Sequence, residues 1–271
     1  MARYLKPLVM NAVGVVVVVL VLVPFLWAVV ESFHGNDVFA PVFSAFRPTV
    51  SNYRFVLLHT AIPRDFLNSF IACASALVVS IPVACFAAYG YSRLRFKGRS
   101  ALFYGVLVTQ LLPATALVIP LYRVWSLAHA FNNLVALGVA YAAANMALAI
   151  LLMRNFFDNL PGALDDASRI DGCSRLQTFW YVLRPLVMPA VAASTVFVFV
   201  NAWQDYLLAS SLITNSGDFT VNVGLYAFEG AFTTDWGAIL ASSVLVSIPS
   251  VLMFALAQRY FVRVVSGGVK E

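Results

Sequence analysis

Six apolar runs, each about as long as a bilayer is thick, constrain the fold of this chain more than any other feature. They cover residues 8–30, 66–91, 101–122, 134–153, 186–213 and 237–261. A helix needs about 20 consecutive apolar residues to cross the hydrocarbon core of a membrane. With 62% hydrophobic and only 11% charged residues, the chain has too much apolar surface for a water-soluble domain. We predict an all-α polytopic membrane protein, a single domain (residues 1–271) of six transmembrane helices.

The first run also has one feature of a secretory signal, because Arg3 and Lys6 precede it. The apolar core of a signal peptide is shorter, at about 7–15 residues. No clear small-residue cleavage site follows the run. We therefore expect a retained first transmembrane helix.

The basic residues predict the orientation of the helices, because Lys and Arg collect in cytoplasmic loops. With the N-terminus inside, thirteen of the seventeen basic residues fall in inner segments. The four in outer segments are Arg47, Arg54, Arg64 and Arg123. We expect both termini in the cytoplasm, residues 31–65 as an outer loop and residues 262–271 as a cytoplasmic tail. This topology accounts for the net charge of +5, so the charge does not indicate a nucleic-acid partner.

The sequence lacks the common motifs of catalysis and metal binding. It contains no GxxxxGK[ST] phosphate loop, no HExxH and no GxSxG. The cysteines Cys73, Cys85 and Cys173 have no metal-binding spacing. We expect no catalytic residue, no metal site and no cofactor bound by this chain itself.

One stretch is rich in charged residues, whereas the rest of the chain is mostly apolar. Residues 154–185, between the fourth and fifth runs, hold eight charged residues: Arg154, Asp158, Asp165, Asp166, Arg169, Asp171, Arg175 and Arg184. A simple connection between helices takes about 2–8 residues. The pattern here predicts two short helices, the first capped by Asn159 with Pro161 in its opening turn, and ended by Gly172. Ser174 and Gln177 fit a capping box that starts the second.

The first of these short helices is amphipathic. Apolar residues at spacings of three and four form one stripe: Leu160, Ala163, Leu164, Ala167 and Ile170. Asp165, Asp166 and Arg169 lie off the stripe, and Asp165 can pair with Arg169 four residues on. A helix on the membrane surface and a docking element for a soluble partner both fit this pattern. A docking element uses apolar anchors in a groove and charges that fix the register.

The stretch "LDDASRIDGCSRLQTFWYVLRPLVMP" resembles the Glu-Ala-Ala signature loop of ABC-importer permeases, and its Ile-Asp-Gly is similar to the carbohydrate branch (maltose, glycerol-3-phosphate and trehalose type). The matching positions are Asp166, Ala167, Ser168, Ile170, Asp171, Gly172, Ser174, Phe179, Pro185, Leu186 and Pro189. Asp166 replaces the family's glutamate, Ser168 its second alanine, and Cys173 a further alanine. Other blocks of the branch follow its usual order: "SNYRFVL", "FLNSF", "AAYGYSRLRFKGRSALF", "QLLPATALVIPLY", "FVFVNAWQDYLLA" and "SGGVKE".

The resemblance implies a type I importer permease, one half of a heterodimer with a homologous permease, in the bacterial cytoplasmic membrane. It implies a cytoplasmic ATPase dimer that uses ATP and Mg, an extracytoplasmic solute-binding (lipo)protein, and a sugar or polyol as solute. Residues 154–185, the coupling loop, would contact the ATPase. The contacting residues would be Leu164, Asp165, Asp166, Ala167, Ser168, Arg169, Ile170, Asp171, Gly172 and Ser174. The outer segment 215–236 matches in position the loop that meets the binding protein.

A polar cluster in the fifth run is the candidate substrate path: Asn201, Trp203, Gln204, Asp205 and Tyr206. Polar groups in lipid are costly and mark function, and amide, acid and aromatic side chains suit a sugar or polyol. The cluster also falls near the outer interface, where Trp and Tyr form belts, so a structural role stays open. Gln110 and Asn145 are expected to form interhelical hydrogen bonds, and Pro113 and Pro120 to kink the third helix.

A stand-alone, ion-driven secondary transporter is the alternative function from another class. Such a transporter needs ionisable groups near the membrane midplane. Only Asp205 comes close to that depth, and the charged loop would have no purpose. The importer reading is therefore preferred.

Overall fold

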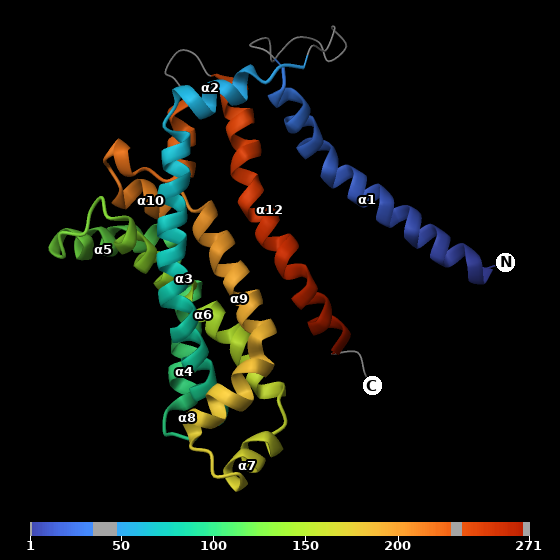
Figure 1. Ribbon diagram of the computed structural model, residues 1–271, viewed down its shortest axis with the longest axis vertical. Helices are drawn as coiled ribbons and strands as arrows, with labels where there is room; N and C mark the ends of the chain where they lie inside the picture. Colours follow the sequence, from blue (N-terminus) through green and yellow to red (C-terminus); the bar gives the residue numbers. More distant parts are fainter. Residues whose placement is uncertain (1, 35–47, 229–234, 268–271) are drawn as a thin grey trace. The chain divides into compact units, whose positions relative to one another are not determined.

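The structure is a computed structural model that describes residues 2–34, 48–228 and 235–267 (Figure 1). Every regular element in these ranges is a helix. The chain forms two compact units, one from Met1–Pro63 and Gly224–Ile248, the other from Arg64–Val223 and Pro249–Glu271. Residues 35–47 of the predicted outer loop and residues 268–271 of the predicted tail lie outside the described residues.

The first unit contains α1 (Ala2–Ser32), α2 (Ser51–His59) and the first turns of α12 (Trp236–Gly267). The buried amide of Asn52 donates hydrogen bonds to the carbonyl oxygens of Ser32 (3.1 Å) and His34 (2.7 Å). A Cβ atom on Gly237 would lie 2.8 Å from that amide nitrogen. The start of α12 therefore needs glycine where it meets α2.

Three long helices dominate the second unit: α3 (Ile62–Arg93), α6 (Leu134–Asn159) and α9 (Arg184–Gln204). Helix α6 packs against α9. The backbones of α3 and α6 come very close where Gly138 meets Ala72 and Ser75, as small residues allow in membrane helices. Five helices are long and apolar enough to cross a membrane, and one bent pair could be the sixth span. The prediction of six spans is thus confirmed by length and composition.

The third apolar run is not one straight helix. It forms α4 (Arg99–Val108), a 3-10 turn (Thr109–Leu111) and α5 (Ala114–Leu127), and the two halves are bent by 102°. The break falls at Leu112, whose extended backbone precedes Pro113. Proline disfavours a helical conformation in the residue before it and donates no hydrogen bond. The predicted kink at Pro113 is confirmed, whereas Pro120 lies inside α5.

The fifth apolar run is also interrupted, so the prediction of one helix over residues 186–213 is wrong. Helix α9 ends at Gln204, and α10 (Leu207–Leu212) starts after a two-residue break. The carboxylate of Asp205 accepts the backbone N–H groups of Leu208 and Ala209, both at 3.1 Å. Asp205 therefore caps α10, which is a favoured use of aspartate that hydropathy does not reveal.

The segment after α10 contains a 3-10 turn (Ser216–Asp218), α11 (Val221–Leu225) and a second 3-10 turn (Tyr226–Phe228). Side chains near the start of α3 hold this segment. The Asn68 amide donates to the carbonyls of Gly217 (3.2 Å) and Phe219 (2.9 Å), and the Ser69 hydroxyl accepts the N–H of Val221 (2.8 Å). Specific polar contacts thus join the start of α3 to the segment after α10.

Candidate functional site: the coupling loop

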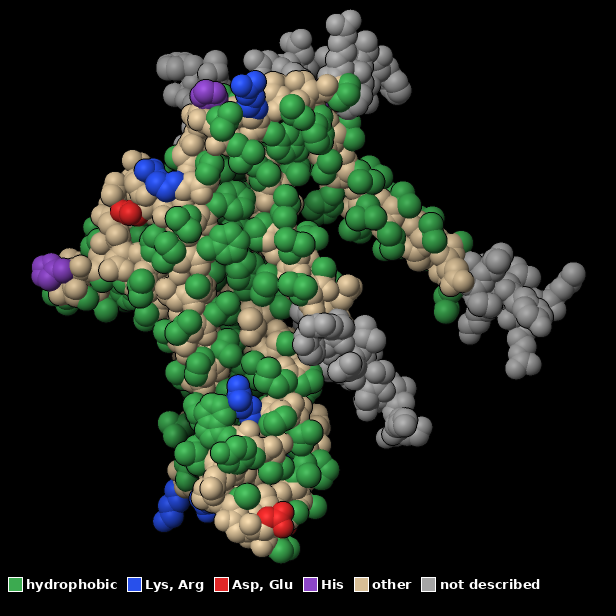
Figure 2. Space-filling view, viewed as in Figure 1, with side chains coloured by type: hydrophobic (Ala, Val, Ile, Leu, Met, Phe, Trp, Pro, Cys, Tyr) green, Lys and Arg blue, Asp and Glu red, His purple; other side chains and the backbone are tan. Residues whose placement is uncertain are grey.

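Helix α7 (Ala163–Ile170) is a separate short helix at the opposite end of the second unit from α10 (Figure 1). Both positive and negative side chains are visible at this end, whereas hydrophobic side chains cover much of the helices above it (Figure 2). The helix begins after Gly162 and has no side-chain cap. The prediction that Asn159 caps it is wrong, because α6 continues through Asn159 and Leu160 is extended.

Gly172 ends the helix as predicted. Its backbone has a φ of +80°, a left-handed conformation that glycine adopts without strain. The N–H of Cys173 donates to the carbonyl of Ser168 (2.9 Å), and the N–H of Gly172 donates to that of Arg169 (3.1 Å). This pair of bonds is a Schellman motif, which fixes the direction in which the chain leaves α7.

The capping box at Ser174 is confirmed. The Ser174 hydroxyl accepts the N–H of Gln177 (3.4 Å), and the Gln177 side chain accepts the N–H of Ser174 (2.8 Å). The prediction of a second separate short helix is wrong, because α8 (Arg175–Gln177) continues through a π-helical segment (Thr178–Leu183) into α9. The capping box therefore starts the fifth span itself.

The two faces of α7 have different surroundings. On the inner face the buried Ser168 hydroxyl lies 2.8 Å from the Thr178 hydroxyl, and Leu164 and Asp165 are half-buried. The outer face is exposed and consists of Ala163, Asp166, Ala167 and Ile170. The predicted apolar stripe is therefore divided, with Leu164 facing the bundle and Ala163, Ala167 and Ile170 facing out, while Leu160 lies before the helix and is half-buried.

The outer face of α7 has the chemistry of a docking surface. Ile170 is 86% exposed, and burying such a side chain against a partner contributes about 1.5–3 kcal/mol. The neighbouring alanines would let a partner approach closely. Asp166 and Arg169 are both strongly exposed and 4.0 Å apart, so their pairing contributes little and leaves both charges available.

Asp165 does not pair with Arg169, so that prediction is wrong. Its carboxylate lies 3.3 Å from the guanidinium of Arg93, at the end of α3. Arg169 is exposed and lies 4.0 Å from Asp166, whereas Asp165 faces the bundle, where Arg93 reaches it. Sequence reasoning missed Arg93 because the two residues are far apart along the chain, and the nearer arginine offered an equally plausible helical spacing.

The predicted substrate-path residues lie at the other end of α9. Trp203 is only 2% exposed. Its ring packs against Phe66, Phe70 and Phe199, with centroids 5.6, 4.8 and 5.5 Å away. Its carbonyl accepts a hydrogen bond from the Asn222 amide (2.5 Å). In this structure Trp203 is therefore an aromatic core residue.

The other members of the cluster are more accessible. Asn201, Gln204 and Tyr206 are exposed, and the Asn201 amide donates to the Phe197 carbonyl of its own helix (2.9 Å). Asp205 is half-buried, caps α10 and interacts electrostatically with the buried Tyr141. The burial of Trp203 thus sets it apart from the exposed members of the cluster, and the contact of the five residues with substrate stays a prediction.

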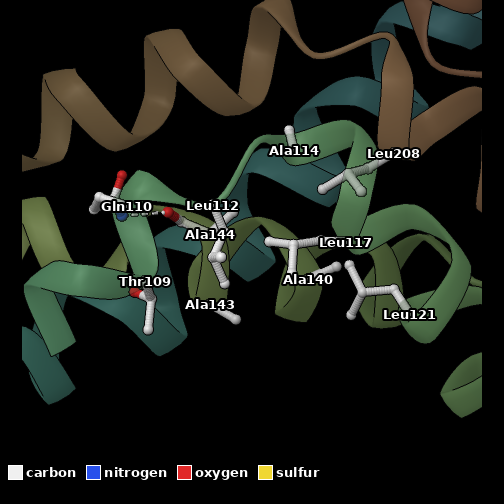
Figure 3. Close-up of a pocket in the computed structure, with 10 residues that line it drawn as sticks. All are labelled: Thr109, Gln110, Leu112, Ala114, Leu117, Leu121, Ala140, Ala143, Ala144 and Leu208. Carbon is white, nitrogen blue, oxygen red and sulfur yellow. Dashed lines mark hydrogen bonds between the residues drawn. The ribbon is translucent and has the colours of Figure 1, made fainter. Parts of the chain in front are cut away.

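A pocket of about 260 Å³ lies where the third apolar run breaks (Figure 3). Its lining comes from both sides of the break, from α6 and from α10: Thr109, Gln110, Leu112, Ala114, Leu117, Leu121, Ala140, Ala143, Ala144 and Leu208.

The Gln110 amide donates to the Ala144 carbonyl of α6 (2.9 Å), which confirms the predicted interhelical bond. Asn145 instead bonds within its own helix, to the Tyr141 carbonyl (2.9 Å), so its interhelical prediction is wrong. Discontinuous helices of this kind form substrate sites in transporters.

The described residues contain no group of three or more His, Cys, Asp or Glu side chains placed to hold a metal ion. What they contain is a bundle of long apolar helices, an interrupted helix beside a pocket, and a short charged helix at one end. This architecture defines a membrane-spanning transport subunit. The chain belongs to the family described as binding-protein-dependent transport system inner membrane components, which matches residues 80–267.

Individual relatives agree with this family. The trehalose/maltose transport system permease protein MalG of Thermococcus litoralis is 30% identical over 269 residues, which cover 97% of this chain and 96% of that protein. The diacetylchitobiose uptake system permease protein DasC of Streptomyces coelicolor is 31% identical over 201 residues, covering 74% and 73%.

A solved structure has the same fold. It is the crystal structure of a bacterial ABC transporter involved in the import of the acidic polysaccharide alginate, with a TM-score of 0.78, 22% identity, and coverage of 96% of this chain and 98% of that one. This chain is therefore a permease subunit and a multi-pass inner-membrane protein, and the ion-driven alternative is set aside.

Proposed function

We propose that this chain translocates a sugar, polyol or related solute as one half of a permease pair. Its partners are a homologous second permease, an ATPase dimer that uses ATP and Mg, and an extracytoplasmic binding protein. The solute class follows from relatives that carry trehalose, maltose or diacetylchitobiose in their names. ATP hydrolysis belongs to the separate ATPase, because this sequence has no phosphate-binding loop.

The end of the second unit that carries α7 faces the cytoplasm, together with both termini. The basic residues support this orientation, since thirteen of seventeen then fall in inner segments. The pocket beside α10 then lies toward the outer side.

The outer face of α7 is the observation that carries the proposal. It presents Ile170, two alanines and Asp166 away from the bundle, while Ser168 and Asp165 fix the opposite face to the rest of the unit. An exposed branched apolar side chain beside two alanines offers a partner an apolar anchor. The ATPase would receive this face in a surface groove, with the charged residues fixing the register.

Co-purification and transport test the proposal together. The chain is expressed with the ATPase, second permease and binding protein encoded beside it, then reconstituted into liposomes. We expect a stable assembly and uptake of radiolabelled disaccharide that requires enclosed ATP. Gly172→Pro should abolish co-purification of the ATPase, because proline cannot adopt the positive φ of this position. Uptake by the chain alone on an ion gradient, without a bound ATPase, would contradict the proposal.

The solute path runs past the pocket at the break of the third span and the polar residues at the end of α9. Asp205→Asn separates the two roles of Asp205, because asparagine caps a helix as well as aspartate does but carries no charge. We expect lower uptake with an unchanged melting temperature. Unchanged uptake by Asp205→Asn would remove this carboxylate from the path.

A further inference from the structure

The end of α3 is fastened to the coupling loop at several points. The Ser92 hydroxyl donates to the Asp158 carboxylate (2.5 Å), at the end of α6. Arg93 donates to the Leu160 carbonyl (2.8 Å), between α6 and α7. These contacts bind α3 to both sides of the point where the chain leaves α6.

Arg93 also holds α7 directly through its ion pair with Asp165 (3.3 Å). The two side chains are only 15% and 17% exposed, so the pair is shielded from water on the inner side of α7. Removing one partner would leave the other charge half-buried without compensation, which costs more than losing an exposed pair. Arg93 thus has two acceptors, the Leu160 carbonyl and the Asp165 carboxylate.

Aromatic contacts complete the attachment beyond α7. The Tyr89 hydroxyl donates to the Arg175 carbonyl (3.4 Å). The Tyr89 ring lies 5.1 Å from that of Phe179 in the π-helical segment and 5.9 Å from that of Phe157 in α6. One face of α3 therefore contacts the end of α6, the inner face of α7 and the start of the fifth span.

These contacts join α3 to the coupling loop, although the two are not adjacent along the chain. The coupling loop is covalently continuous with α6 and α9 only, whereas α3 lies far away in sequence. A displacement of α7 reaches α6 and α9 through the backbone. Among the contacts of the described residues, Arg93 joins α3 to the Asp165 carboxylate of α7 and to the Leu160 carbonyl, so the displacement reaches α3 through Arg93.

We propose that Arg93 is a positioning residue for energy coupling: by holding the inner face of α7, it makes α3 move with the coupling helix. The inference rests on the proposed function, in which the outer face of α7 contacts an ATPase. The inner face of α7 transmits the displacement to α3, through the contact of Asp165 with Arg93. Arg93 does not contact the ATPase or the solute in this arrangement.

Four variants of the reconstituted importer test this role. Arg93→Gln removes the ion pair, Arg93→Lys retains the charge, Asp165→Asn removes the other partner, and Arg93→Asp with Asp165→Arg exchanges the two. Arg95→Gln is the matched control, because Arg95 is exposed and only two residues away. The measured quantities are ATPase co-purification, basal and solute-stimulated ATP hydrolysis, and solute transported per ATP.

We expect Arg93→Gln to retain the ATPase and its basal activity but to transport about three- to thirtyfold less solute per ATP, the range of typical coupling energies. Asp165→Asn should lower the same ratio of transport to hydrolysis. Arg93→Lys and the charge exchange should recover part of this loss, and Arg95→Gln should behave as wild type. A merely structural residue would lower assembly and leave the ratio of transport to hydrolysis unchanged. That outcome would overturn the inference.

A distance measurement with Arg93 and Asp165 both unchanged covers the case in which these variants fail to assemble. A spin label on the native Cys173, directly after α7, is paired with one on Val78→Cys, an exposed position of α3. We expect their distance to stay constant between nucleotide-free and ATP-trapped complexes. A change in this distance would overturn the inference. Failure of the wild-type chain to bind an ATPase would instead refute the proposed function.

Discussion

Gly138→Ala is a sharp test of the packing in the second unit. Gly138 lies in α6 and is buried against α3. An added Cβ atom would lie 2.5 Å from the Cβ of Ser75 and 2.6 Å from the carbonyl oxygen of Ala72. Neither atom can rotate away, because one is a backbone oxygen and the other is fixed to the backbone. The two helices must therefore move apart.

The size of the effect follows from two opposing contributions. Forcing an extra methyl group into a packed interface costs about 1–3 kcal/mol, and the cost here belongs at the upper end because the obstructing atoms are rigid. The better helix propensity of alanine returns up to about 1 kcal/mol. We expect a net loss of about 2 kcal/mol in the free energy of unfolding. This loss corresponds to a melting temperature lower by about 4–8 °C.

Tryptophan fluorescence during heating of the detergent-solubilised protein measures this change. Gly105→Ala is the matched control, because Gly105 lies inside α4 and an added Cβ would meet nothing within 4 Å. This control should keep or raise the melting temperature, since only the helix propensity changes. If Gly138→Ala melts at or above the wild-type temperature while the control behaves as expected, α3 and α6 do not approach this closely.

Substitutions at three further residues probe the two ends of the second unit. Ile170→Asp should leave the melting temperature unchanged, because the side chain is 86% exposed, but should abolish ATPase co-purification; retained binding would exclude Ile170 as an anchor. Gly172→Ala should destabilise by about 1–2 kcal/mol through its positive φ, whereas Gly172→Asn, which tolerates this conformation, should cost less; equal melting temperatures would contradict the Schellman assignment. Trp203→Ala should cost about 3–5 kcal/mol in unfolding free energy, and Trp203→Phe much less; a loss of uptake at unchanged stability would instead indicate substrate contact.

Local signals predicted the C-terminal end of α7 and the capping box at Ser174 better than they predicted the partners of α7. Gly172 and Ser174 act on residues within a turn of themselves, so their effect is readable from the sequence. The pairing of Asp165 depends on which side of α7 faces the bundle, and a single sequence does not contain that information. The nearer Arg169 therefore looked like its partner, although Arg93 occupies that place.

Hydropathy located the spans but not their interruptions. The third run is apolar through Leu112, and the fifth run has apolar residues on both sides of Asp205, so an average over 20 residues does not register the breaks. The break at Pro113 has a recognisable cause in the sequence. The break at Asp205 depends on the capping of α10, and the same residue was read as part of a polar path. An aspartate that caps a helix and an aspartate that lines a solute path look the same in the sequence, and only the geometry distinguishes the two roles.

The contacts of the second unit favour motion of α3, α6 and α9 as one body. At the α7 end, Arg93 joins α3 to the coupling loop. In the middle, Gly138 holds α6 against the α3 backbone at a distance that permits little sliding. At the α10 end, Asn68 and Ser69 fasten α3 to the segment after α10. Because these attachments lie at both ends and in the middle, bending within the unit would break several of them at once. Rocking of the whole unit would leave all of them intact.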